Sequence, residues 1–141
     1  MRVRCVSNDP GDLPREVVEA LTPNPGAVAF FAEDLTVGEE YVVHALQIRS
    51  DQVWYYLCAN RGEDSPYRYP SQVFELTDPR LSRLWQFSHQ RSAKTGLWTT
   101  LFAVPDWVND LGFYERLVDG HEAERAIFKR YRFLMDEEER R

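Results

Sequence analysis

The sequence predicts an α+β fold in which a small antiparallel β-barrel is followed by extra strands and two C-terminal helices packed on it. Short segments rich in β-branched and aromatic residues recur between residues 27 and 78, a pattern typical of small antiparallel barrels. One of these segments, Val53–Ala59, is apolar throughout, and beyond Pro105 apolar residues recur at helical spacing. We therefore expect a single domain over residues 1–141, divided into a barrel core (27–78), additional strands with a loop (79–104) and C-terminal helices (105–140).

The first 26 residues predict a strand, a turn and a short helix. Residues 1–8 fit an opening strand, and Asp9–Asp12 has the proline and glycine of a turn. Asp12 is placed to cap a helix over Leu13–Leu21, with a proline in its first turn, where a missing N–H costs nothing. The prolines of Thr22–Gly26 then end that helix, because they cannot continue its hydrogen-bond ladder.

Five strands are predicted for the barrel core: Ala27–Phe31, Tyr41–Ile48, Val53–Ala59, Tyr67–Tyr69 and Val73–Thr77. Residues 49–52 indicate a turn, and the glycine within residues 60–64 indicates a hairpin. Side chains alternate between the two faces of a strand, so Trp54 and Tyr56 lie opposite Tyr55 and Leu57. Neither face is polar, so we expect the barrel interior to cover one and a ligand or another part of the chain to cover the other.

The C-terminal third predicts two strands and two helices. Strands are expected over 83–87 and 99–104, around a polar loop that contains a glycine. One helix opens at Pro105 and ends at Asp119–Gly120, with an apolar stripe of Trp107, Leu111, Tyr114 and Val118. A second runs from about 121 to 139, with Ala123, Ile127, Tyr131 and Leu134 on one face and Phe128 and Met135 beside it. Each buried apolar side chain contributes about 1.5–3 kcal/mol, so both helices are expected to dock.

Three segments resemble those of Src-homology-3 domains. Asp34–Val43 resembles the E-L-S-F-x-x-G-D-x-I-x-V segment, Val53–Ala59 resembles the W-W-x-A-R strand, and Tyr69–Leu76 resembles the closing x-P-S-N-Y-V segment. Their order and spacing agree over residues 29–76. The resemblance implies a Src-homology-3-like (SH3-like) barrel, with Trp54 and Pro70 at the family's peptide groove.

Two departures from that family bear on the ligand. The A-L-Y-D-Y segment, which supplies groove tyrosines, has no counterpart around residues 30–33, and Val73 stands where the family has another groove tyrosine. Recognition of proline-rich peptides needs an aromatic-lined groove. The resemblance therefore implies the barrel without implying a proline-rich ligand.

The charge of the chain is unevenly distributed. The formal net charge is −6, yet residues 79–105 hold Arg80, Arg83, Arg91 and Lys94 and no acidic residue. Phosphate contacts supply most nucleic-acid affinity, so an acidic chain predicts no nucleic-acid partner. Local binding of a nucleic acid through residues 80–94 nevertheless stays open, as an alternative to the two function hypotheses given at the end of this subsection. It predicts binding that depends on salt.

The apolar runs, the N-terminal sequence and the two cysteines predict a reduced cytoplasmic protein without a membrane span. The longest apolar run, Val53–Ala59, is far shorter than a membrane helix, and the N-terminus turns polar before a signal-peptide core can form. Cys5 and Cys58 match no metal-site spacing. Two buried thiols are expected for them, with a single disulfide as the alternative.

No motif in the sequence predicts a reaction. His121–Arg125 begins like the H-E-x-x-H zinc motif but places an arginine at the second ligand position, and Lys94–Gly96 lacks the partner motifs of penicillin-binding proteins. Nothing in the spacing of Cys58, His44 and His89 predicts a nucleophile and its base. We predict no catalytic residue, no metal and no cofactor.

The aromatic content, 13% of the chain, predicts binding instead. Trp107, Tyr114, Phe128 and Tyr131 are expected to form helix cover, and Trp85, Phe87 and Phe102 to form strand core. Phe74 and one side of the Trp54-Tyr55-Tyr56 run are assigned to the barrel, and Trp54, Tyr67 and Tyr69 are the aromatic residues singled out for binding. Together with their neighbours they predict a partner-binding site made of Trp54, Tyr67, Arg68, Tyr69 and Pro70. On this prediction, Trp54→Ala or Tyr69→Ala removes the partner and leaves the circular dichroism unchanged.

Two function hypotheses follow from these observations. The first is a non-catalytic protein-interaction module, of an immunity or antitoxin-like kind, whose acidic surface or aromatic face holds a basic partner protein. The alternative is a small-molecule-binding protein or enzyme with a pocket between the barrel and the helices, lined by Trp85, Trp107, His44 or His89. The oligomeric state is not predicted.

Overall fold

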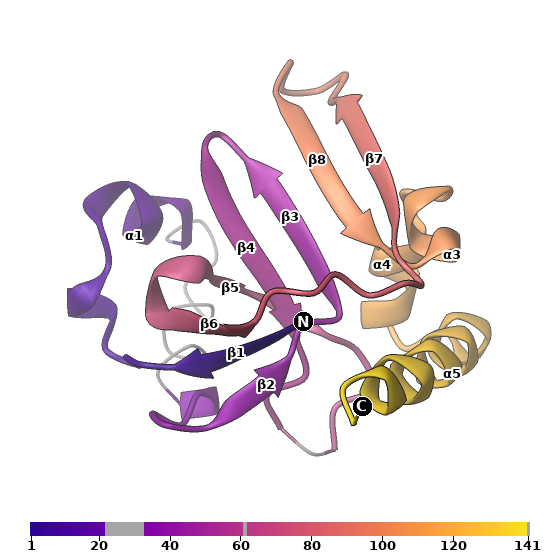
Figure 1. The fold of residues 1–141 in the computed structure, drawn as a ribbon. Helices are drawn as coiled ribbons and strands as arrows, with labels where there is room; N and C mark the ends of the chain where they lie inside the picture. The colour runs from indigo at the N-terminus through magenta and orange to yellow at the C-terminus, as the bar shows by residue number, and fades with distance from the viewer. Residues whose placement is uncertain (22–32, 61, 141) are drawn as a thin grey trace.

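The computed structural model describes residues 1–21, 33–60 and 62–140. Within them the α+β class is confirmed: eight strands lie in two antiparallel sheets, and helices lie at both ends of the chain (Figure 1). The recorded strand pairs keep the two sheets separate, so a closed barrel is not shown. The strand predicted over Ala27–Phe31 and the helix stop at Thr22–Gly26 lie outside the described residues.

The smaller sheet holds the N-terminal strand at its centre. Its order is β2 (Glu40–Val42), β1 (Arg2–Cys5) and β6 (Phe74–Asp78). Val3 pairs with Tyr41 on one side and Leu76 on the other, and its side chain is fully buried. The opening strand predicted from residues 1–8 is therefore confirmed, and it joins two segments that are far apart in sequence.

The larger sheet has the order β5 (Tyr67–Pro70), β4 (Gln52–Leu57), β3 (Ala45–Arg49), β8 (Trp98–Ala103) and β7 (Gln86–Arg91). Ser50 and Asp51 form the tight turn between β3 and β4, both with positive φ, as a two-residue hairpin of the I′ type requires. The turn predicted at residues 49–52 is thus confirmed. β4 and β5 also pair antiparallel, as the hairpin signal at residues 60–64 predicted.

Both faces of β4 are covered, as the apolar run predicted. Leu57 belongs to a first core, which joins the two sheets and helix α1 (Arg15–Leu21) through residues such as Val3 and Val17. Tyr56 belongs to a second core, formed with the C-terminal helices. Trp54 shares a strand face with Tyr56 but is buried as part of the first core.

The C-terminal helices form the cover of the second core. They are α3 (Pro105–Val108), α4 (Phe113–Val118) and α5 (Glu122–Glu138), and they gather beside the larger sheet (Figure 1). Trp107 meets Tyr56 edge-on at 4.9 Å between ring centroids and stacks on Tyr114 at 4.8 Å. The Tyr114 hydroxyl donates to the Pro66 carbonyl at 2.8 Å, which ties α4 to the segment before β5. The predicted docking is confirmed.

The single helix predicted from Pro105 to Val118 is wrong. The backbone breaks at residues 109–112, where the Asp110 carboxylate accepts the Gly112 N–H at 3.0 Å. After the break the buried positions shift to Phe113 and Leu117, while Leu111, predicted on the apolar stripe, is 64% exposed. The short polar turn at residues 109–112 shifts which positions of the following helix face the core. The apolar spacing continues across this turn in the sequence, so the spacing alone did not reveal the break.

The apolar face of α5 also differs from the prediction. Phe128 and Met135, predicted beside that face, are its two fully buried residues, whereas Ala123 and Leu134 are exposed. Tyr131 is partly buried and donates its hydroxyl to Asp106 at 2.8 Å. The buried stripe is therefore rotated about the helix axis from the one that spacing alone predicted.

Three smaller expectations at the strand and helix ends need correction. Strand β7 begins at Gln86, so Trp85 precedes it, and Phe87 is 60% exposed instead of being strand core. Asp12 ends a 3₁₀ turn (Pro10–Asp12) whose cap is Asp9, and Asp12 accepts a hydrogen bond from Ser7 at 2.7 Å. By contrast, Cys5 and Cys58 are free thiols as expected, although only Cys5 is buried and Cys58 is half-buried.

Candidate functional site

The five residues predicted to bind a partner lie together on strands β4 and β5. Trp54 pairs across the strands with Pro70, and the Arg68 guanidinium lies over the Trp54 ring, 4.7 Å from its centroid. Trp54, Tyr69 and Pro70 are buried, whereas Tyr67 and Arg68 are half-buried. The side-chain surface that this group leaves for a partner is therefore small.

Tyr69 is held from inside the fold. Its hydroxyl donates to the Asp34 carboxylate at 3.2 Å, and burial together with that carboxylate raises the pKa of Tyr69 well above its ordinary value. Asp34 also accepts a hydrogen bond from the Asn60 amide at 2.8 Å. Buried polar groups in folded proteins are normally hydrogen-bonded within the protein, as the Tyr69 hydroxyl is. These contacts therefore favour a structural role for Tyr69.

The four residues predicted to line a pocket do not come together. The Trp85 indole N–H donates to the His44 carbonyl at 3.1 Å, but Trp107 lies in the second core among Tyr56 and Tyr114. His89 lies on strand β7, where it stacks on Trp98. A surface cleft near α5, lined by Arg80, Leu81, Arg83, Glu138 and Glu139, measures about 80 Å³, well below the roughly 300 Å³ of ordinary ligand sites.

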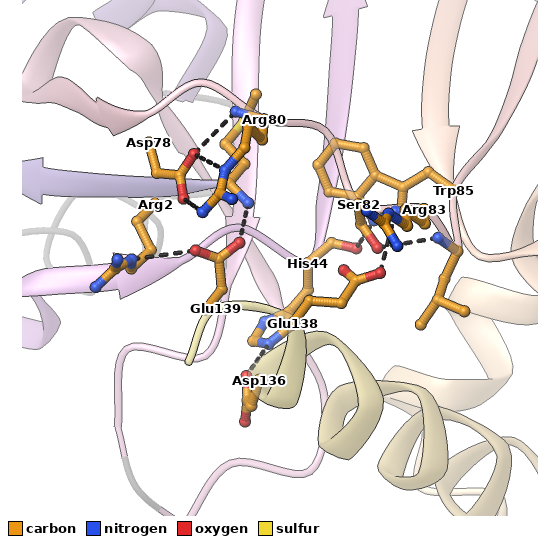
Figure 2. Close-up of polar contacts among 12 residues, drawn as sticks. Arg2, His44, Asp78, Arg80, Ser82, Arg83, Trp85, Asp136, Glu138 and Glu139 are labelled. Carbon is orange, nitrogen blue, oxygen red and sulfur yellow. Dashed lines mark hydrogen bonds and ion pairs between the residues drawn. The ribbon is translucent and has the colours of Figure 1, made fainter. Parts of the chain in front are cut away.

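Figure 2 shows the polar contacts that fasten α5 to the strands. The Arg2 Nε donates to Glu139 Oε2 at 3.1 Å, and the N-terminal ammonium group also contacts Glu139. Glu138 accepts the Arg83 backbone N–H at 3.1 Å. The hydrogen bonds that Arg80 donates to Asp78 hold the pKa of that carboxyl well below its usual value. Each of these carboxylates has a cation or an N–H as its partner. The cluster therefore has a structural role: it links the N-terminal strand and the segment before β7 to the C-terminal end of α5.

His44 is a second buried titratable group of this cluster, besides Asp78. Its Nε2 lies 3.3 Å from Asp136 Oδ1, while its Nδ1 has no hydrogen-bond partner among the described residues. Desolvation lowers the pKa of His44; Asp136 opposes this shift, and Arg132 and the N-terminal ammonium add to it. The imidazole is therefore neutral at pH 7.

The stability of the fold should fall below about pH 6.5 because of His44. In the unfolded chain His44 binds a proton near pH 6.5, whereas the folded imidazole binds it only at lower pH. Stability is then complete above the unfolded pKa and falls as the pH drops, by at most about 1.4 kcal/mol per pH unit. Urea unfolding at pH 7.5, 6.5 and 5.5 measures this slope. His44→Gln should flatten it, and equal slopes in both proteins would contradict the assignment.

The thiol of Cys58 faces a different environment from that of a catalytic cysteine. Burial raises its pKa to about 12, so the thiol is protonated at neutral pH. A reactive cysteine needs the thiolate form. The described residues also contain no cluster of three or more His, Cys, Asp or Glu side chains arranged to hold a metal ion.

The hairpin formed by β7 and β8 carries a feature that the sequence-based reasoning missed. The His89 ring stacks on Trp98, with centroids 4.7 Å apart and planes within 11°, and Phe87 stacks on the other side of His89 at 6.4 Å. Trp98 is 55% exposed, and His89 is exposed as well. We refer to Phe87, His89 and Trp98 as the aromatic strip.

The aromatic strip stands at the border of the first core. Phe102, partly buried and packed against that core, meets Phe87 edge-on at 5.3 Å. The hairpin projects beside the β3–β4 hairpin, away from the C-terminal helices (Figure 1). The alternation Phe87-x-His89 facing Trp98-x-Thr100-x-Phe102 was visible in the sequence, but it gives no sign of whether anything covers that face.

Comparisons with known proteins identified no protein similar to this chain. No protein-family model, no curated protein and no solved structure matches the chain. In the part of the chain that the structure describes, no helix combines the length and the apolar character needed to cross a bilayer.

Proposed function

We propose that the chain is a non-catalytic, cytoplasmic protein-interaction module whose partner protein binds the aromatic strip. The observation that supports this most is the exposed stack of Phe87, His89 and Trp98. Folded proteins seldom leave large adjacent aromatic side chains in water without a functional reason. Aromatic residues are also enriched at the centres of protein interfaces, because they offer large, rigid contact areas.

This proposal moves the binding surface away from the Trp54–Pro70 group. The strip belongs to the stretch 79–105, which has no acidic residue; every acidic residue of the chain lies outside that stretch. An acidic partner suits the strip. An immunity or antitoxin-like role, in which the acidic surface holds a basic partner, is a separate prediction that a toxin-like gene beside this one would support.

A single-stranded nucleic acid is the competing occupant, because bases also stack on exposed aromatic rings. Such sites track the phosphate backbone with several cations. The hairpin offers only Arg91 and Lys94, and the chain as a whole carries −6. These charges favour a protein.

Trp98→Ala should weaken partner binding at least about tenfold while the free energy of unfolding falls by about 1.5 kcal/mol or less. A central interface tryptophan is worth about 2 kcal/mol or more, whereas an exposed aromatic pair contributes only about 0.5–1.5 kcal/mol. Proteins captured from a cell lysate by the wild-type chain would be identified and purified. Titration calorimetry then gives their dissociation constants for wild type and variant.

Phe133→Ala is the matched control, because Phe133 is 64% exposed but lies on α5, outside the strip. It should leave the dissociation constant unchanged. A partner whose affinity is equal for wild type and Trp98→Ala would contradict the proposal. So would an oligonucleotide that binds with strong salt dependence and is lost in Trp98→Ala.

A further inference from the structure

Strand β7 is an edge of the larger sheet, and the phase of its hydrogen bonds can be read from the structure. The Ser92 N–H donates to the Leu97 carbonyl at 2.9 Å, next to the pair Arg91 and Trp98. Along an antiparallel ladder, bonded and non-bonded pairs alternate. The backbone N–H and C=O groups of Phe87, His89 and Arg91 therefore point away from β8, toward the open edge.

The same three residues carry the side chains of the strip's face. Phe87, His89 and Arg91 alternate onto one side of β7, opposite Phe102, Thr100 and Trp98 of β8. A strand added to β7 would bring its side chains about 4.5–5.5 Å from those of Phe87, His89 and Arg91. Backbone pairing and aromatic contact are thus offered together at one edge.

The β7 edge lacks most of the devices that usually protect an open strand, and its one charged residue, Arg91, lies at its end. It has six residues in regular register, with no proline and no lysine, whereas natural edges are commonly short, bulged, or marked by proline or charge. The opposite edge, β5, has four residues and ends at a buried proline, Pro70. Of the two edges, β7 is the one built to accept a strand.

The positive charge of the β7–β8 hairpin favours a partner strand that carries negative charge. Its charged residues are Arg91 and Lys94, both exposed, and no acidic residue lies between Gln86 and Ala103. Arg91 is the cross-strand neighbour of Trp98, and its guanidinium donates to the Gly96 carbonyl at 3.0 Å, so its charge lies at the turn end of the strip. A carboxylate two positions beyond an apolar residue would reach Arg91 while the apolar residue covers His89.

We propose that an extended, acidic segment of a partner protein binds by adding a strand to β7. The inference rests on the proposed function and deepens it, because it assigns the partner's conformation and charge. Main-chain hydrogen bonds to Phe87, His89 and Arg91 supply affinity, as in other cases of strand addition, and the strip and Arg91 supply side-chain preference.

A random dodecapeptide library displayed on phage is the probe for this proposal. Peptides selected on the full-length wild-type chain should carry apolar residues at alternate positions, with Asp or Glu two positions further along. Their synthetic forms should lose affinity at least about fivefold in Arg91→Gln. Selected peptides that are rich in lysine, or indifferent to Arg91→Gln, would overturn the assigned charge.

His89→Pro and His89→Ala test the backbone pairing. Both remove the imidazole, but only proline removes the outward N–H, and the bonds of the β7–β8 ladder stay intact because an edge strand tolerates proline where its N–H faces solvent. The proline variant should bind the selected peptide about tenfold more weakly than the alanine variant. Equal affinities of two folded variants would overturn strand addition.

Hydrogen exchange of the wild-type chain gives a readout that needs no variant. The amides of Phe87, His89 and Arg91 should slow at least about tenfold on adding the peptide, whereas those of Ser88 and Gln90 are already protected by the ladder. Unchanged exchange at all three outward amides would overturn strand addition even if His89→Pro fails to fold. Loss of binding in Trp98→Ala alongside that result would leave the proposed function standing, whereas unchanged binding in Trp98→Ala would remove both.

Discussion

Phe128→Ala is expected to lower the free energy of unfolding by about 3–5 kcal/mol, the cost of a large cavity in a well-packed core. Phe128 is 1% exposed, belongs to the second core and meets His44 edge-on at 5.8 Å. Its loss would loosen α5 from His44, which directly precedes β3. Urea unfolding followed by circular dichroism measures the change as a lower midpoint.

Phe133→Ala is the control for this measurement, since the same substitution is made five residues further along the same helix. Phe133 is 64% exposed, so its removal should change the free energy of unfolding by about 0.5 kcal/mol or less. If the two variants unfolded at the same urea concentration, the rotation of α5 described above would be incorrect.

Trp54→Ala is expected to cost about 3–5 kcal/mol of stability as well. The indole is 3% exposed within the first core, and its removal also takes away the ring that Arg68 covers. A loss of this size is a large part of the stability of a typical domain, about 5–15 kcal/mol. The sequence-based expectation of an unchanged fold in this variant is accordingly replaced by a destabilised one.

Trp98→Ala provides the matched comparison, because it removes the same side chain from an exposed position. Its urea midpoint should stay close to that of the wild-type chain, while that of Trp54→Ala falls clearly below both. If Trp98→Ala were the more destabilised of the two, the indole of Trp98 would be part of a core. The description of the aromatic strip as an exposed binding surface would then be wrong.

The α+β class and the covered faces of β4 could be predicted because each depends on local pattern. Val53–Ala59 has no polar alternation, and a strand of that kind must be covered on both sides. The apolar residues after Pro105 supplied a cover for one side, and Tyr56, Trp107 and Tyr114 do meet there.

The exposed surface was less accessible to sequence reasoning. Phe87 and Phe102 are neighbours across β7 and β8 and look equivalent as strand aromatics, yet Phe102 packs against the first core while Phe87 lies mostly in water. The difference depends on how far the core extends along the larger sheet, which strand periodicity does not encode. The reverse applies to Tyr69, which is buried and donates its hydroxyl to Asp34 of a distant segment, a contact that strand periodicity does not encode.

The four tryptophans give a direct test of where a partner binds. Their indole N–H signals can be followed by NMR: Trp54 and Trp107 are buried, Trp85 donates to the His44 carbonyl, and Trp98 is exposed on the strip. On titration with a selected peptide or purified partner, the Trp98 signal should shift in proportion to the bound fraction while those of Trp54 and Trp107 stay in place. A shift of the Trp54 signal with Trp98 unchanged would contradict the account and return the binding site to β4 and β5.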